Sequence, residues 1–166
     1  MKHACYVSPA WEHAFEHYVI WQLNAAPSRR QYDLLVPGGH ATVETRKAAS
    51  ITRGYVRTVK TLIELLELPG GWNSYNASPI RKENVTFAVD LLSRLMHENT
   101  PEPDVVPKVR GGVQLEWHTR GVNIEISIDS PDNVKFFAED ILGGQEPVEE
   151  DLDETLLARW VDRISA

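Results

Sequence analysis

From residue 113 to residue 128, apolar and polar side chains alternate with a period of two, interrupted once at Thr119-Arg120-Gly121. Successive side chains of a β-strand point to opposite faces of a sheet, so this pattern predicts two half-buried strands joined by a tight turn. The polar positions should share one face of the pair: Gln114, Glu116 and His118 on the first strand, and Asn123, Glu125 and Ser127 on the second.

The segments on either side of this pair extend the predicted sheet. Val105–Val109, before Gly111-Gly112, indicates a preceding strand, and Val134–Ala138 indicates a following one. The links between these segments are too short for crossover connections, so the sheet should be an antiparallel meander of three or four strands.

Helical periodicity is found before and after the sheet. Apolar residues recur at spacings of three and four over about residues 9–24, 44–68 and 79–97, and again from about Pro147 to the end. The acids between residues 149 and 154 would then lie at the start of the last helix, which suits its dipole. We therefore expect an α+β fold with N-terminal helices, a small antiparallel meander and a C-terminal helix.

The chain divides by composition into two parts. Residues 1–43 contain a predicted helix and then a connection rich in proline and glycine, with a short strand at Tyr32–Val36. This part either packs on the rest or forms an arm. Residues 44–166 hold the remaining predicted elements and should form the α+β core domain.

Composition excludes several classes of protein. A single cysteine cannot form an internal disulfide or a four-cysteine zinc site. No apolar run approaches the roughly 20 residues of a membrane-spanning helix. The first residues also lack the apolar stretch of a signal peptide, so we expect a cytoplasmic protein that does not bind membranes.

Charge is distributed unevenly along the chain. Residues 29–60 contain seven bases and two acids, whereas residues 98–166 contain six bases and sixteen acids. Helical spacing gathers part of the positive charge on the face of the 44–68 helix opposite its apolar face, at Arg46, Arg53, Arg57 and Lys60. Such a basic stripe either binds nucleic-acid phosphates or is solvated and paired with acids.

The string His13-Ala14-Phe15-Glu16-His17 matches a zinc-hydrolase motif. On a helix His13 and His17 could bind one zinc ion, and Glu16 could activate a metal-bound water. A catalytic zinc site needs a third protein ligand, and nothing in the sequence singles one out among candidates such as Glu83 and Glu98. We therefore interpret the string as the polar face of an amphipathic helix, and expect no metal and no cofactor.

Two groups of residues are candidates for contact with a partner. Trp72, Asn73 and Tyr75 lie on a loop between two predicted helices, where aromatic residues commonly anchor partners, although Trp72 could instead cover the core. Glu116 and His118 lie on the polar face of the predicted sheet, which is either a binding surface or simply solvated.

The middle of the chain carries a recurring pattern: Leu68-Pro69-Gly70-Gly71-Trp72-Asn73, a helix led by Pro79, then Pro103, Val105, Pro107, Gly111-Gly112 and Leu115-Glu116-Trp117. It resembles a group of small uncharacterised bacterial proteins with the pattern G-W-[DN], a helix, P-x-x-x-P and D-G-G-x-x-L-E-W. The resemblance covers about residues 62–128. It implies a bacterial or mobile-element protein and no particular activity. The usual aspartate is replaced by Arg110.

Together these features favour a small regulatory or inhibitory protein that binds a protein partner, as in toxin–antitoxin or phage–host systems. Its acidic last third could cover the basic surface of a nucleic-acid-binding partner. Two alternatives remain open, nucleic-acid binding through the 44–68 helix and zinc-dependent hydrolysis through His13, Glu16 and His17. Self-association as a homodimer through an exposed sheet edge also stays open.

Overall fold

The computed structural model describes residues 31–36, 39–44, 52–144 and 146–166. The chain separates into two units, residues 1–47 and residues 48–166. The predicted helix over residues 9–24 and the first part of the predicted 44–68 helix lie outside the described residues. With them lie the residues of the zinc motif and one residue of the basic stripe: His13, Glu16, His17 and Arg46.

The first unit contains a two-stranded antiparallel sheet. Strand β1 (Gln31–Val36) pairs with β2 (Gly39–Glu44), with Gln31 opposite Glu44. Strand β1 confirms the short strand predicted at Tyr32–Val36, whereas β2 was not predicted.

The second unit is built on a five-stranded antiparallel sheet in which the strands follow one another in chain order. The strands are β3 (Asp104–Pro107), β4 (Val113–Thr119), β5 (Val122–Ser130), β6 (Asn133–Asp140) and β7 (Val148–Asp151). The α+β class and the meander are confirmed, but the expected number of three or four strands is wrong.

The extra strand is β7, which the sequence interpretation assigned to the start of the last helix. Its sequence has one valine followed by three acids, which is also typical of a first helical turn. Pairing with β6 places Val148 opposite Ala138 and makes the segment an edge strand. The predicted turn between β4 and β5 is present as Arg120-Gly121, and both residues have positive φ angles, 53° and 73°, as a tight hairpin requires.

Three helices and one short turn accompany the sheet. Helix α2 (Arg53–Glu64) continues into η1 (Leu65–Glu67), α3 spans Lys82–Leu95 and α4 spans Glu154–Ser165. The Asp153 carboxylate caps α4 by accepting hydrogen bonds from the backbone N–H groups of Thr155 and Leu156, at 2.8 and 3.0 Å. Within the described ranges, no helix combines the length and the apolar character that crossing a bilayer demands.

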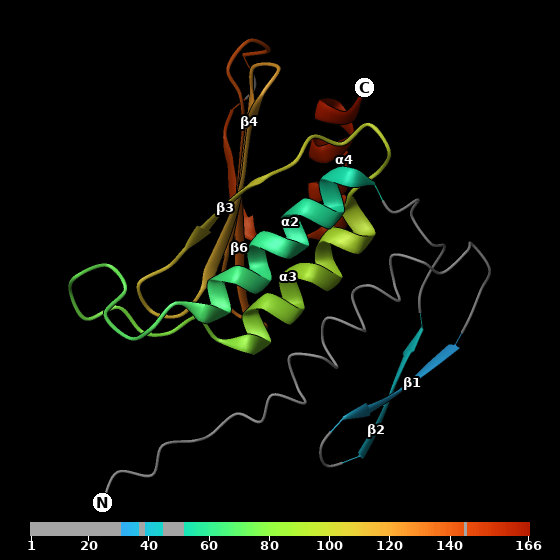
Figure 1. The fold of residues 1–166 in the computed structure, drawn as a ribbon. Helices are drawn as coiled ribbons and strands as arrows, with labels where there is room; N and C mark the ends of the chain where they lie inside the picture. The colour runs from blue at the N-terminus through green and yellow to red at the C-terminus, as the bar shows by residue number, and fades with distance from the viewer. Residues whose placement is uncertain (1–30, 37–38, 45–51, 145) are drawn as a thin grey trace, which may run out of the picture. The chain divides into compact units, whose positions relative to one another are not determined.

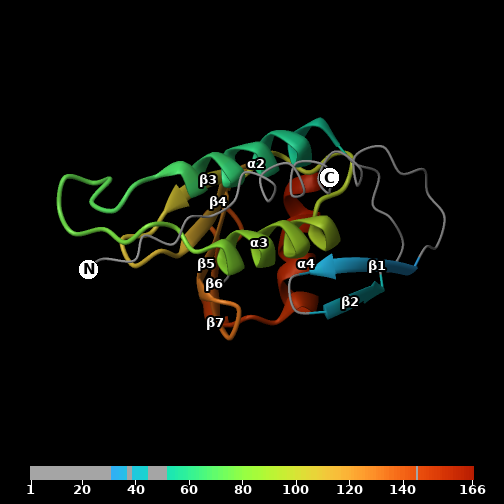
Figure 2. The same cartoon turned by 60° about the horizontal axis from the view of Figure 1, so that its bottom comes forward.

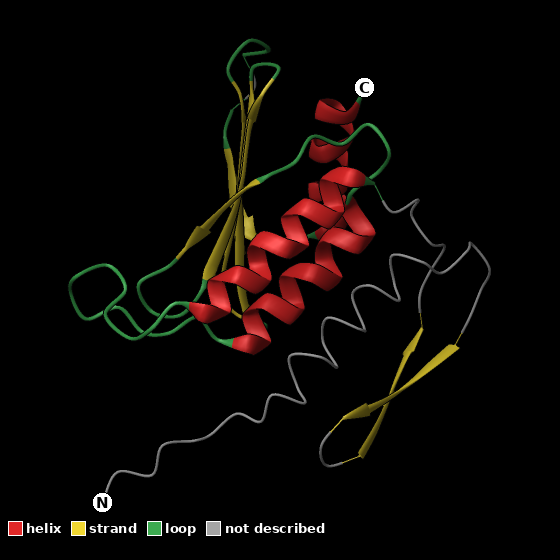
Figure 3. Cartoon of the chain, viewed as in Figure 1, coloured by secondary structure: helices red, strands yellow, loops and turns green. Residues whose placement is uncertain are grey.

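All three helices lie on one face of the sheet (Figures 1 and 2), and no helix within residues 52–144 and 146–166 covers the other face (Figure 3). The covered face carries the apolar residues of the alternation, which are 0–6% exposed. They are Val113, Leu115, Trp117, Val122, Ile124, Ile126 and Ile128. The Trp117 indole N–H donates to the carbonyl of Pro101 at 2.8 Å, so this large side chain is both buried and satisfied.

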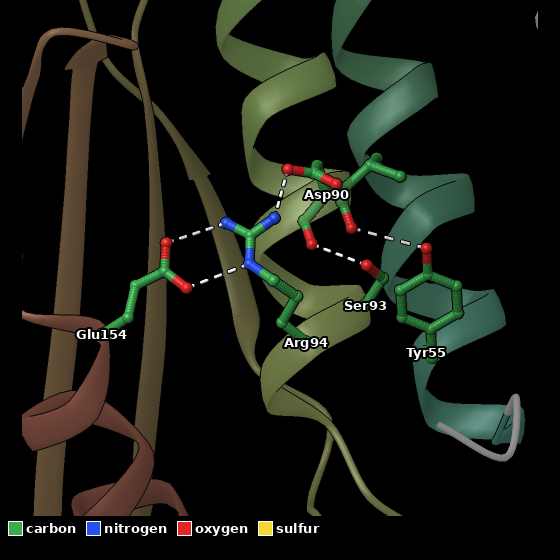
Figure 4. Close-up of polar contacts among 6 residues, drawn as sticks. Tyr55, Asp90, Ser93, Arg94 and Glu154 are labelled. Atoms are coloured by element: carbon green, nitrogen blue, oxygen red, sulfur yellow. Dashed lines mark hydrogen bonds and ion pairs between the residues drawn. The ribbon is translucent and has the colours of Figure 1, made fainter. Parts of the chain in front are cut away.

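An arginine fork fastens α3 to α4 (Figure 4). The Nε and Nη2 atoms of Arg94 donate to the two oxygens of Glu154, each at 3.0 Å, and Nη1 contacts Asp90 one turn earlier on α3. Such a bidentate pair fixes geometry better than a single ion pair. The three helices thus form one layer that packs on the covered face of the sheet. The opposite face carries no described helix.

Candidate interaction surface

The open face of the sheet carries the polar residues of the alternation, and the strand register arranges them in rows. The central row crosses all five strands and consists of Asp104, Glu116, Glu125, Phe137 and Glu149. One flanking row consists of Val106, Gln114, Ser127, Lys135 and Asp151. The other consists of His118, Asn123 and Glu139. We call this surface the outer face.

The outer face is strongly acidic. Its three rows contain six carboxylates and one lysine, Lys135, and four of the carboxylates lie in the central row. Neighbouring strands are about 4.8 Å apart, so the central row spans about 19 Å. The face therefore presents a line of negative charge with one aromatic side chain in it.

Two glutamates of the central row lie directly opposite each other, Glu116 on β4 and Glu125 on β5. Like charges at such a pair are destabilising. Gln114 reduces the repulsion because its amide Nε2 donates to Glu116 Oε1 at 2.8 Å and to Glu125 Oε2 at 3.2 Å. Gln114 is itself oriented by Ser127, whose hydroxyl donates to the Gln114 Oε1 at 3.1 Å.

His118 extends this hydrogen-bonded network into the next row. Its Nε2 lies 3.2 Å from Glu116 Oε2 and its Nδ1 lies 3.1 Å from Asn123 Oδ1. Both partners are acceptors in this orientation of the Asn123 amide, whose Nδ2 donates to Glu139 at 3.4 Å. The hydrogen bonds to Asn123 and Glu116 raise the pKa of His118 above its usual value, because both favour the imidazolium form.

The structure thus brings together the two sheet residues that the sequence predicted, Glu116 and His118, and confirms the partners expected opposite them, Glu125 and Asn123. The network is held by hydrogen bonds between side chains, while 46% of the His118 side chain remains exposed. In the described part of the chain, no cluster of three or more His, Cys, Asp or Glu residues has a metal-binding arrangement. The chemistry that this arrangement favours is recognition of cations by an open surface.

The three loop candidates lie away from the sheet, in the connection between η1 and α3. The Trp72 indole N–H donates to the carbonyl of Ser78 at 3.2 Å, and Asn73 Oδ1 accepts from the backbone N–H groups of Tyr75 and Ala77 at 3.0 and 3.3 Å. Trp72 and Asn73 therefore close the loop on itself. Tyr75 is 82% exposed and is the loop residue most available to a partner.

The described members of the basic stripe, Arg53, Arg57 and Lys60, are exposed on α2. Two of them are paired with acids. Arg57 lies 2.8 Å from Glu102, and Lys60 lies 3.7 Å from Glu64 one turn along the helix. These ion pairs reduce the positive potential that a phosphate backbone would meet on α2.

Sequence reasoning missed three residues of the central row: Asp104, Phe137 and Glu149. Phe137 follows another phenylalanine, and only the register shows that Phe136 faces the core while Phe137 faces outward. Glu149 was assigned to the start of the last helix, and Asp104 lies one residue before the strand predicted at Val105–Val109. The signal that could have found Phe137 is the continuation of the period of two through residues 134–139, whereas no comparable alternation marks Asp104 or Glu149.

Comparisons with protein-family models, with curated proteins and with solved structures found no match to this chain.

Proposed function

We propose that this protein binds a basic protein partner through the outer face and acts in the cytoplasm as a regulator or inhibitor of that partner. The observation that carries the proposal is the central row, where strand register places four carboxylates and one aromatic side chain on a sheet face that no described helix covers. Toxin–antitoxin and phage–host systems are the settings that suit such an inhibitor.

The charge of the face supports this partner chemistry. Six carboxylates and one lysine attract a positively charged surface and repel nucleic acid. A row of about 19 Å is long enough to contact several side chains of a partner segment. A partner that uses its basic surface to bind nucleic acid would lose that surface when it is docked here.

Order in the network also supports a binding role. Gln114, Glu116 and His118 hold one another in defined positions before any partner arrives. A surface that is already ordered loses less conformational entropy on binding. The opposed glutamates Glu116 and Glu125 repel each other, and a cationic partner would relieve that repulsion. Like charges at directly opposed strand positions are unfavourable, and an unfavourable local arrangement of this kind is typical of functional surfaces.

Nucleic-acid binding through α2 is the second candidate. Its support is the exposure of Arg53, Arg57 and Lys60 on one helix, and the ion pairs of Arg57 and Lys60 weaken it. Zinc-dependent hydrolysis stays a prediction from the sequence, because His13, Glu16 and His17 lie outside the described residues.

The proposal is tested by affinity capture from the native host with three forms of the full chain. The first is wild type, the second carries Glu116→Gln, Glu125→Gln and Glu149→Gln, and the third carries the same charge change elsewhere, at Glu67→Gln, Glu98→Gln and Glu146→Gln. Wild type and the control should capture one basic protein that the outer-face variant loses. Capture unaffected by the outer-face variant, or capture of nucleic acid alone, would contradict the proposal.

A further inference from the structure

We infer that the outer face contains an arginine-recognition site at Glu125, Phe137 and Glu149, in which a partner's guanidinium group stacks on the Phe137 ring between the two carboxylates. This inference rests on the proposed function and makes it specific, because it names the residue type by which the partner is recognised.

The register of three neighbouring strands creates the site. Phe137 on β6 lies opposite Glu125 on β5 and opposite Glu149 on β7. Side chains at directly opposed positions have Cβ atoms about 4.5–5.5 Å apart. Phe137 is only partly buried, whereas its neighbour Phe136, which faces the core, is 1% exposed. An aromatic side chain is therefore kept at the surface with a carboxylate on each side.

Guanidinium chemistry fits this arrangement better than ammonium chemistry does. The planar guanidinium stacks on an aromatic face, and its N–H groups point outward in its own plane toward neighbouring carboxylates. A lysine ammonium is a compact, strongly hydrated charge that pairs with one carboxylate at a time. The site should therefore prefer arginine to lysine by more than carboxylates alone would, because the Phe137 ring adds stacking to the bidentate pairing that any carboxylate offers a guanidinium.

The chain already contains one arrangement of this kind. The Arg163 guanidinium lies 4.7 Å from the centroid of the Trp160 ring and also contacts the Asp140 carboxylate. An aromatic ring, a carboxylate and an arginine thus pack together within this fold. On the outer face the ring and the carboxylates are present, and the arginine would come from the partner.

The experiment measures the affinity of octa-arginine and of octa-lysine peptides for the full chain by calorimetry at low salt. Wild type should bind octa-arginine about threefold or more tightly than octa-lysine, which is the contribution expected of a cation–π contact at an exposed site. The Phe137→Leu variant should show a smaller preference for octa-arginine, because it loses the stacking and keeps the carboxylates. The Phe137→Tyr variant should keep the preference, and Tyr75→Leu, which removes an exposed aromatic outside the sheet, should also keep it.

The two proposals fail in different ways. Equal affinity of wild type for the two peptides, or an unchanged preference in Phe137→Leu, would overturn the arginine site and leave the acidic docking face standing. Absence of binding by either peptide would overturn both. Circular dichroism of each variant verifies that the sheet is intact, and Phe137→Tyr supplies the second test if Phe137→Leu fails to fold.

Discussion

His118 is the residue whose ionisation is most directly coupled to the outer face. Hydrogen bonds to Asn123 and Glu116 raise its pKa above 6.5 in the folded state. The stability it contributes is therefore fully present below pH 6.5, the unfolded value, and is lost as pH rises through the folded-state pKa.

We predict that an NMR titration of the His118 ring gives a pKa above 6.5, and that Asn123→Ala lowers it, because the variant removes the strongest hydrogen bond to the imidazolium form. Thr86→Ala on α3, which removes a hydroxyl far from the network in sequence, is the control and should leave the titration unchanged. A His118 ring that titrates at or below 6.5 in wild type would show that the network does not hold the imidazolium.

Gly111 is a residue for which the backbone allows no substitute. Its φ is +82°, and a Cβ atom there would lie 2.7 Å from the carbonyl oxygen of Pro79. We predict that Gly111→Ala lowers the free energy of unfolding by at least about 1–3 kcal/mol, the cost of such backbone strain alone. Gly70→Ala, whose Cβ would meet its nearest atom at 4.0 Å, should be nearly neutral. Urea denaturation of both variants compares them, and equal losses would contradict this explanation.

At the scale of elements, the helix layer depends on polar links as well as on apolar packing. The fork between Arg94 on α3 and Glu154 on α4 joins two helices that are far apart in the sequence. We predict that Arg94→Gln lowers the free energy of unfolding by about 0.5–1 kcal/mol, since the pair is partly exposed.

The control for this prediction is Lys60→Gln, which breaks the exposed pair with Glu64 within α2. That variant should cost at most about 0.5 kcal/mol, the value of a single exposed pair within one helix. Thermal denaturation of the two variants measures the difference. If Lys60→Gln lowered the free energy of unfolding by more than Arg94→Gln does, the fork would stabilise the protein no more than an ordinary exposed ion pair.

Elements whose sequence pattern lies within their own residues could be predicted, whereas elements that depend on a distant strand could not. The period of two in β4 and β5 predicted both strands, their turn and the face shared by Glu116 and Glu125, because alternation fixes which side chains share a face. The direct pairing of Glu116 with Glu125 came from the structure. Strand β7 could not be predicted in this way. Four residues with three acids become a strand only because β6 offers an edge to pair with, and that is a tertiary effect.

The residues of the candidate site also divide into those with a local sequence signal and those placed by strand pairing. Glu116 and His118 were predicted because they belong to one alternating strand, whereas Phe137 and Glu149 join them only through pairing across β6 and β7. Trp72 and Asn73 were candidates for a partner interface, with Trp72 also open as a cover of the core. In the structure their polar atoms bond within the 70–78 loop, and their contact with a partner stays a prediction.

At the scale of the whole molecule, the uneven charge has a structural location. Acids that the sequence showed only as a surplus in the last third are gathered by the sheet register into the outer face. Both edge strands have four residues, and they carry Asp104 and Pro107 on β3 and three acids on β7. Short, charged and proline-bearing edges discourage edge-to-edge pairing between copies of the chain.

The division into units predicts which part of the chain is sufficient for the proposed binding of a basic partner. The buried residues of the described core, the fork between α3 and α4, and the whole outer face belong to residues 48–166. We predict that a fragment of residues 48–166 unfolds cooperatively with the same thermal midpoint as the corresponding transition of the full chain, because every buried apolar residue of the described part of the chain lies within it.

The same fragment should retain the affinity of the full chain for octa-arginine, since Glu125, Phe137 and Glu149 lie within it. Calorimetry and thermal denaturation of the fragment beside the full chain measure both quantities. A fragment that melts without cooperativity would show that the first unit completes the core. A folded fragment that has lost peptide affinity would show instead that the basic peptide contacts residues 1–47, and the outer face would then not be the binding surface.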